Sequence, residues 1–221
     1  MDPRPYSFRT KEEYAFQALR QAILDCKLPP GEKLVIDRLS AKLGLSPIPV
    51  RAAVQRLHSE GLVMISPHSS ATIAPLPPEK VNEVFVLLES LERTAFRAAA
   101  DRVSPADLQD LESLLQEMDA AQERPDPDAW LSLNIAFHRK IAAVADMPLL
   151  LSFTNRVLDE WERISHYYYA NITSKRLPQA QADHRQIVAL LRSGDALGLD
   201  ALAIAHNRAA NQAYQATLTE S

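Results

Sequence analysis

The sequence predicts a mostly α-helical protein with two domains, residues 1–75 and residues 76–221. Glycine occurs only five times in 221 residues and aromatic side chains make up 6%, which favours helices over a β-rich fold. Apolar residues recur at three- and four-residue spacing along most of the chain, the period of an amphipathic helix. Three prolines within residues 75–78 interrupt this pattern, because proline restrains the backbone to extended conformations. We therefore place the domain boundary there.

The N-terminal domain opens with a helix and closes with a small hairpin. Thr10 and Glu13 form a capping box, and the helix that they start runs to about Cys26. Residues 62–65 and 71–74 are short apolar stretches on either side of a turn, which predicts two strands.

Between these elements, residues 39–61 predict two short helices joined by a tight turn. Gly44 suits the end of the first helix, because a residue that tolerates positive φ is favoured there. Ser46 suits the N-cap of the second helix and Pro47 its first position, where a missing N–H costs nothing. This pattern alone also fits a helical hairpin in an all-α core. The hairpin that follows favours a winged helix-turn-helix of three helices and a two-stranded wing.

The second helix of this pair has an outward polar face. A helix fits the major groove of DNA, and Arg and Gln side chains reach base edges there. We expect DNA contacts from this face, the turn before it, the preceding helix and the wing. The candidate residues are Arg51, Ser46, Pro47, Ile48, Gln55, Arg38 and Ser69.

Charge and cysteine content fit an intracellular DNA-binding protein. The net charge is −4, but residues 1–75 hold ten Lys and Arg against seven Asp and Glu, whereas the remainder holds 14 against 21. A mildly basic first third suits a DNA-binding head. The single cysteine excludes an internal disulfide and suits a reducing cytoplasm. The N-terminus lacks a signal-peptide pattern and no apolar run approaches a membrane span, so we expect a cytoplasmic protein with no membrane partner.

The second domain shows helical periodicity without a strand pattern, which predicts an all-α bundle of about six helices. Five of the predicted helices span residues 81–101, 104–121, 148–169, 177–192 and 195–217. Asp128 caps a sixth, whose apolar residues are Trp130, Leu133, Phe137 and Ile141.

Three histidines, His138, His184 and His206, lie in the middle of separate predicted helices. Asn134 precedes His138 by four residues, so the two side chains share one helix face. In an antiparallel bundle the three helices can each direct an imidazole to the centre, where neutral imidazoles and an amide oxygen can bind a divalent metal. The alternative is that each histidine is half-buried and bonded to a neighbour.

Four arginines on predicted helices are candidates to anchor a carboxylate ligand, because a buried guanidinium pairs with a carboxylate through two hydrogen bonds. Surface salt bridges are the alternative. The four are Arg93, Arg97, Arg156 and Arg163.

Two sets of residues together resemble a known family. Residues 19–24, 28–34, 43–51 and 57–63 resemble the head of GntR-type transcription regulators, with Leu-Pro-Pro-Gly-Glu and Pro-Val-Arg blocks in register. The second domain, with residues 134–138 and the two later histidines, resembles the all-helical FCD effector domain of the FadR branch.

The resemblance implies a homodimer that binds a palindromic operator, and a helical domain that binds a small organic acid, often beside a metal. Carried over to this chain, the metal ligands are Asn134, His138, His184 and His206. The implied ion is divalent, zinc first, with nickel or manganese as other options. We therefore expect a ligand-responsive transcription regulator, more often a repressor, whose effector is a small carboxylate.

The chain departs from the family pattern at several positions. Asn134 stands where Asp is usual, which implies weaker metal binding. Pro47 stands where Arg is common, and residues 69–70 are serines where the wing commonly carries Arg-Gly, which implies fewer phosphate contacts and a shallower salt dependence. Leu88 stands where many relatives have an arginine, so we expect the effector to be anchored differently.

Two other functions fit a three-histidine site. A metal-dependent hydrolase would use bound zinc to activate water. However, the sequence ties no Glu or Asp to the histidines by motif as a general base, and the N-terminal domain has no role in such chemistry. In a metal sensor, the ion itself would be the signal.

Overall fold

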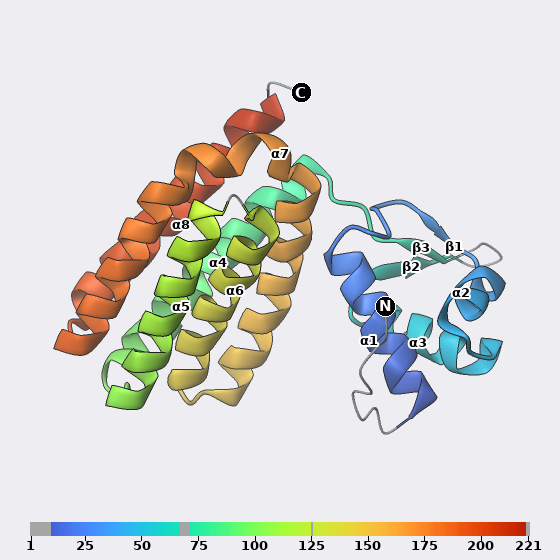
Figure 1. Ribbon diagram of the computed structural model, residues 1–221, viewed down its shortest axis with the longest axis horizontal. Helices are drawn as coiled ribbons and strands as arrows, with labels where there is room; N and C mark the ends of the chain where they lie inside the picture. Colours follow the sequence, from blue (N-terminus) through green and yellow to red (C-terminus); the bar gives the residue numbers. More distant parts are fainter. Residues whose placement is uncertain (1–9, 67–70, 125, 220–221) are drawn as a thin grey trace. The chain divides into compact units, whose positions relative to one another are not determined.

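The computed structural model describes residues 10–66, 71–124 and 126–219 (Figure 1). The chain divides into two compact units, Met1–Leu76 and Pro77–Ser221. Their boundary lies one residue from the one expected from the proline-rich segment. Eight helices and three short strands make up the described part of the chain.

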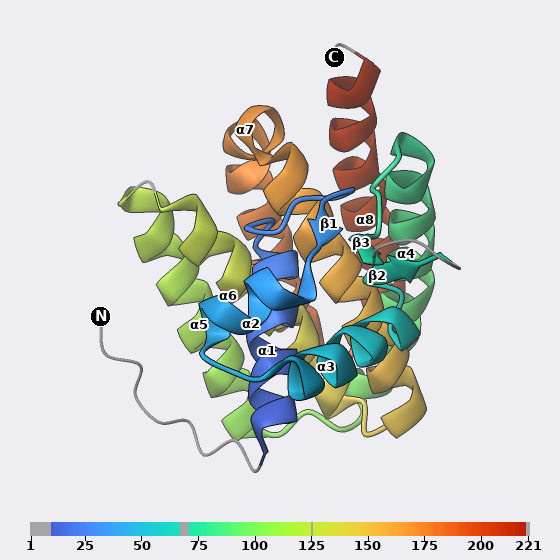
Figure 2. The ribbon, with the colours of Figure 1, turned by 90° about the vertical axis from the view of Figure 1, so that its right-hand side faces the viewer.

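The first unit contains three helices and a small antiparallel sheet (Figure 2). The strand order is β1-β3-β2, and Val63 of β2 pairs with Ile73 of β3. Both predicted strands of the wing are present as β2 and β3, and β1, which was not predicted, adds a third strand by pairing Lys33 with Thr72. The elements are α1 (Lys11–Leu24), β1 (Lys33–Leu34), α2 (Ile36–Leu43), α3 (Pro47–Ser59), β2 (Val63–Ile65) and β3 (Ala71–Ile73).

The turn between α2 and α3 has the predicted backbone. Gly44 ends α2 in the left-handed region at φ 66°, where a side chain would be strained, and Pro47 begins α3. Ser46 occupies the N-cap of α3, but its side chain accepts no capping hydrogen bond. The turn is therefore set by glycine and proline rather than by a serine cap.

An apolar core and one arginine hold α3 against α1. Phe16 of α1 and Val50 and Leu57 of α3 are buried in this core. The guanidinium of Arg56 lies 3.6 Å from the centre of the Phe16 ring and 2.7 Å from Oε2 of Glu13. This cation–π contact and ion pair fix the side of α3 that faces α1 and leave its other side outward.

The second unit is a helical bundle in which α4 packs against α7 and α8, and α5 packs against α6. Ser104 and Asp107 form a capping box at the start of α5. Asp126, rather than Asp128, caps α6 by accepting a hydrogen bond from the Ala129 amide. None of the helices in the described residues has the length and hydrophobicity of a membrane span. The helices are α4 (Pro78–Ala100), α5 (Pro105–Glu123), α6 (Pro127–Val144), α7 (Pro148–Ser193) and α8 (Ala196–Thr219).

Helix α7 corrects the predicted number of helices in the bundle, because it unites the two that were expected over residues 148–169 and 177–192. It is sharply bent, as Figure 1 shows near its label. The rings of Trp161 and His184 lie 6.3 Å and 5.3 Å from the His138 ring, whereas a straight helix would hold the two residues roughly 34 Å apart. Pro178 lies between them, lacks an N–H and crowds the preceding turn, which bends a helix. Both arms of α7 therefore line the bundle interior.

Candidate metal centre, ligand pocket and DNA-binding face

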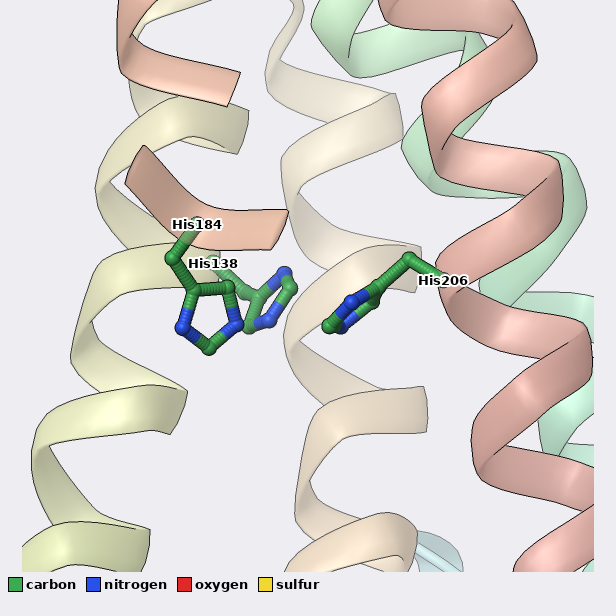
Figure 3. A group of neighbouring side chains, drawn as sticks. All are labelled: His138, His184 and His206. Atoms are coloured by element: carbon green, nitrogen blue, oxygen red, sulfur yellow. The ribbon is translucent and has the colours of Figure 1, made fainter. Parts of the chain in front are cut away.

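Three helices bring the predicted histidines together in the bundle interior (Figure 3). His138 comes from α6, His184 from α7 and His206 from α8, and all three are buried. Their ring centres lie 5.1–5.5 Å apart, and one ligand atom from each lies within 4.8 Å of the others. A tetrahedral ion with bonds of about 2.0–2.1 Å separates its ligand atoms by roughly 3.4 Å. Side-chain adjustments on the scale of an ångström would therefore close this set around an ion.

Oxygen acceptors orient two of these rings. Nδ1 of His206 lies 3.0 Å from Oδ2 of Asp183, and Nδ1 of His184 lies 3.4 Å from Oε1 of Gln181. When Nδ1 donates its proton to such an acceptor, Nε2 keeps the lone pair that binds a metal. Nε2 of His184 is buried and has no hydrogen-bond partner. Both rings thus present Nε2 as the ligand atom.

Glu92 of α4 lies beside the third ring. Its Oε1 is 2.7 Å from Nδ1 of His138, at an angle that does not make a hydrogen bond, and its Oε2 accepts one of 2.6 Å from Asn207. Burial favours a higher pKa for Glu92, but the neighbouring His138 and His206 and the bond from Asn207 lower the pKa more, so the carboxylate is the favoured form.

Glu92 was not among the candidate residues, although the sequence carries a signal for it. Leu88 and Phe96, four residues on either side of it, are buried, so Glu92 interrupts the apolar stripe of α4. A carboxylate in such a stripe is rarely left unpaired.

Asn134 adds an unpartnered oxygen to the lining that His138 and His206 share. Its Oδ1 is buried without a hydrogen-bond partner, and Asn134 lines the same pocket as His138 and His206. Burial lowers the pKa of His184 well below its usual value and also lowers the pKa of His206, although Asp183 opposes the second shift. These two imidazoles are therefore neutral near pH 7, the form that binds metals.

A pocket with a volume of about 50 Å³ adjoins the histidines. Its walls are mainly apolar and aromatic. Its charged members are Glu92 and Arg176, a residue that the sequence analysis did not select. Leu88 lines the pocket, at the position where many family members were expected to carry arginine. The apolar and aromatic lining includes Phe85, Leu88, Trp130, Leu158, Trp161 and Tyr214.

The four arginines proposed as effector anchors lie elsewhere, and none lines this pocket. Arg93 forms two hydrogen bonds with Asp200, of 3.0 and 3.1 Å. Arg97 and Arg156 are exposed. Arg163 is only 1% exposed and forms an ion pair of 3.0 Å with Glu160. Arg176 was not selected because it lay between two predicted helices, 148–169 and 177–192, whereas α7 runs through this segment and its bend brings Arg176 to the pocket.

The predicted DNA-binding residues that the structure describes are exposed on α2, on α3 or in the turn between them. Ile48 is 79% exposed, and Arg51 and Gln55 are exposed one and two turns further along α3. Ser46 and Pro47 are exposed at the start of α3, and Arg38 is exposed on α2. Within the described part of the chain, Arg51 forms no ion pair, in contrast to Arg56. Ser69 of the predicted wing lies outside the described residues.

Comparison with protein families assigns both units. Residues 11–73 match the model for bacterial regulatory proteins of the gntR family, and residues 83–209 match the FCD domain. The chain belongs to the GntR family and carries an FCD domain. Membership in the GntR family confirms the resemblance noted in the sequence and makes the chain a DNA-binding transcription regulator.

Individual relatives agree with this assignment. This GntR-family chain is 28% identical to the HTH-type transcriptional regulator McbR of Escherichia coli (strain K12) over 174 residues. The matched region covers 77% of this chain and 77% of McbR. It is 24% identical to the HTH-type transcriptional repressor RspR of the same strain, over 82% of this chain and 80% of the relative. These relatives are transcription regulators and not enzymes, so the hydrolase alternative has no support.

Solved structures share the fold. The structure of E. coli McbR/YncC superposes with a TM-score of 0.80 at 24% identity, over 90% of this chain and 94% of that one. A GntR regulator from Rhodococcus sp. RHA1 superposes with a TM-score of 0.77 at 20% identity, over 92% and 97% of the two chains.

Proposed function

We propose that this GntR-family regulator is a cytoplasmic, homodimeric repressor whose DNA binding responds to a small carboxylate bound beside a divalent metal. The observation that carries the proposal is the convergence of three buried histidines next to a pocket that contains a cationic side chain. The relative RspR is named a repressor, which supports repression over activation.

Asn134 and the three histidines are the proposed ligands of the metal. Asn134 contributes Oδ1, and His184 and His206 contribute Nε2, because Gln181 and Asp183 accept from their Nδ1 atoms. Bound there, the ion supplies a coordination position for a carboxylate oxygen. Zinc suits nitrogen ligands, and nickel or manganese are the other candidates.

Arg51 and Gln55 are proposed to read the operator from the exposed side of α3. In a dimer, two such helices address two half-sites about one turn of DNA apart, which predicts a palindromic operator. The effector changes operator affinity only as far as it binds the two states of the dimer differently, typically by about 1–3 kcal/mol.

The first experiment is a thermal melt of chelator-stripped protein, with and without zinc, across a panel of small carboxylic acids. We expect zinc to raise the melting temperature and at least one acid to raise it further only when zinc is present. A gel shift with operator DNA then shows whether that acid lowers DNA affinity.

The variants His184→Gln and His166→Gln test whether the effect of zinc on the melting temperature arises at the histidine cluster. Both histidines lie on α7, but His166 stands apart from the cluster and is 3.6 Å from Asp128. Loss of the zinc effect in the first variant and its retention in the second supports the metal centre. An unchanged zinc effect in His184→Gln contradicts it. Metal-dependent DNA affinity with no response to any acid would favour the alternative, a metal sensor.

A further inference from the structure

We infer that the pocket beside the histidines selects a short monocarboxylate with an apolar body, and that Arg176 pairs with its carboxylate. This inference rests on the proposed function, because it names the chemical class of the effector for the same pocket. Three features of the lining carry it: one cation with unused donors, a single buried acid, and few free polar partners.

Arg176 is the cation of the pocket. It lies on the second arm of α7, is half-buried, and donates one hydrogen bond of 2.7 Å to the main-chain carbonyl of His206. A guanidinium has five N–H donors, and Arg176 forms no ion pair among the described residues. A bound carboxylate would supply the missing anion through two hydrogen bonds.

Glu92 disfavours a second carboxylate on the ligand. Glu92 is the acidic side chain of the described lining and is buried. Its two carboxylate oxygens already contact His138 and Asn207. Because Arg176 and the proposed ion would share the first carboxylate, a second one would lie among apolar walls without a cation of its own and would be repelled by Glu92. Burying an unpaired charge is costly, so dicarboxylates are selected against.

The polar groups of the lining also disfavour a hydroxylated ligand body. Nδ2 of Asn207 already donates to Glu92 and to the carbonyl of Ala203. The hydroxyl of Tyr214 lies 2.7 Å from the hydroxyl of Ser165. Apart from the two unpartnered indole N–H groups described next, hydroxyl groups of a sugar acid would therefore meet engaged partners or apolar side chains, and each buried group without a partner weakens binding.

Two indole N–H groups add donors that suit one carboxylate. Nε1 of Trp130 and Nε1 of Trp161 are buried, have no hydrogen-bond partner, and belong to residues that line the pocket. A carboxylate offers about four acceptor positions, enough for the proposed ion and Arg176 together with one of the indoles. The volume of about 50 Å³ holds only a few water molecules at about 10–15 Å³ for each, which favours a short acid.

Three acids with four-carbon chains test the inference on the zinc-loaded, full-length protein. Butyrate has an apolar body, 3-hydroxybutyrate adds one hydroxyl group, and succinate replaces the terminal methyl with a second carboxylate. Calorimetric titration gives each dissociation constant. We expect butyrate to bind at least about tenfold more tightly than either other acid, because each adds a buried polar group without a partner. Equal or tighter binding of succinate or 3-hydroxybutyrate overturns the inference and leaves the proposed function standing.

Two matched variants test the role of Arg176. Arg176→Met removes the charge and keeps the length of the side chain, and Arg156→Met makes the same change at an exposed position of the same helix. We expect at least about a tenfold weaker binding of butyrate in the first variant and no change in the second. Unchanged binding in Arg176→Met overturns the assignment. If Arg176→Met does not fold, the relative affinities of the three acids for the unmodified protein decide whether the inference stands. If neither the three acids nor two further acids, citrate and gluconate, bind the protein, both this inference and the effector part of the proposed function fail.

Discussion

Asp183 and His206 are joined across α7 and α8 by a contact of 3.0 Å between Oδ2 and Nδ1. The carboxylate fixes the ring orientation of a proposed metal ligand without touching the metal itself. It also accepts a hydrogen bond of 2.8 Å from Gln179, so its own position is fixed. Such outer carboxylates fix the tautomer and orientation of a ligating ring and raise its basicity.

Replacement of this carboxylate tests the metal centre. We expect Asp183→Ala to weaken zinc binding by about 10- to 100-fold, because the His206 ring loses its orientation and basicity. Competition with a chromogenic chelator measures the affinity. Asp200→Ala removes an acid that instead pairs with Arg93 at a partly exposed position, and it should leave zinc affinity unchanged. Equal zinc affinity in the two variants contradicts the proposed role of Asp183.

Asn134→Asp is expected to tighten metal binding. The amide oxygen is buried and unpartnered, so a carboxylate at this position adds a negative charge directly to the ligand set. We expect a gain in zinc affinity of about tenfold or more, a change of roughly 1.4 kcal/mol. Asn82→Asp adds the same charge at an exposed position of the bundle and serves as the control. No gain in Asn134→Asp would show that this oxygen does not reach the ion.

Arg51 and Arg56 lie on opposite sides of α3, so replacing each in turn distinguishes a role in DNA binding from a role in stability. We expect Arg51→Ala to weaken operator binding by about 1–3 kcal/mol without lowering the melting temperature, because this side chain is exposed and forms no ion pair in the described residues. Arg56→Ala should lower the melting temperature instead, because it removes the contacts with Phe16 and Glu13. Gel shifts and thermal melts of both variants check this. Unchanged operator affinity in Arg51→Ala would remove α3 as the recognition helix.

Asp107 is expected to make the stability of the bundle depend on acid pH. The Lys140 ammonium, followed by two hydrogen bonds from Ser104, lowers the pKa of Asp107 to about 2 from its ordinary value of 3.8. A carboxylate with a lowered pKa stabilises the folded state above its unfolded pKa, and this contribution is lost as the pH falls from about 4 towards 2. After discounting for solvent exposure, we expect Asp107→Asn to cost about 1 kcal/mol at pH 7.

Urea unfolding at pH 7 and at pH 3 measures this effect. The difference between Asp107→Asn and the unmodified protein should shrink at the lower pH. Asp110→Asn is the control, because Asp110 also contacts Lys140 but is largely exposed and takes no part in the capping box. A difference that stays constant with pH would rule out the carboxylate charge as its source.

The winged helix-turn-helix was predictable because its signals are local. Gly44 and Pro47 restrict the backbone themselves, and their positions in the structure are as predicted. Strand β1 was missed because two residues cannot show an alternating pattern and become a strand only by pairing with β3.

The bundle interior was predictable only in part. The three histidines could be selected as candidate site residues because their residue type limits the chemistry that they perform. Arg176 and Glu92 could not be selected in this way, because Arg and Glu are common on solvated helix faces. The position of Arg176 depends on the bend of α7, where Pro178 was expected to begin a new helix and lies inside one instead. Tertiary packing, rather than local pattern, decides which of several arginines reaches the pocket.

The hydrogen bond between Glu92 and Asn207 joins residues 115 positions apart in the chain. The histidine centre beside it draws on three of the five helices of the bundle, and Glu92 lies on a fourth, so the centre exists only when most of the domain has assembled. An ion held there would bind the folded chain and not the unfolded one, adding about 2.7 kcal/mol of stability at a free concentration one hundred times its dissociation constant. The supply of metal in the cell would then set how much of this regulator survives proteolysis, as well as how it responds to its effector.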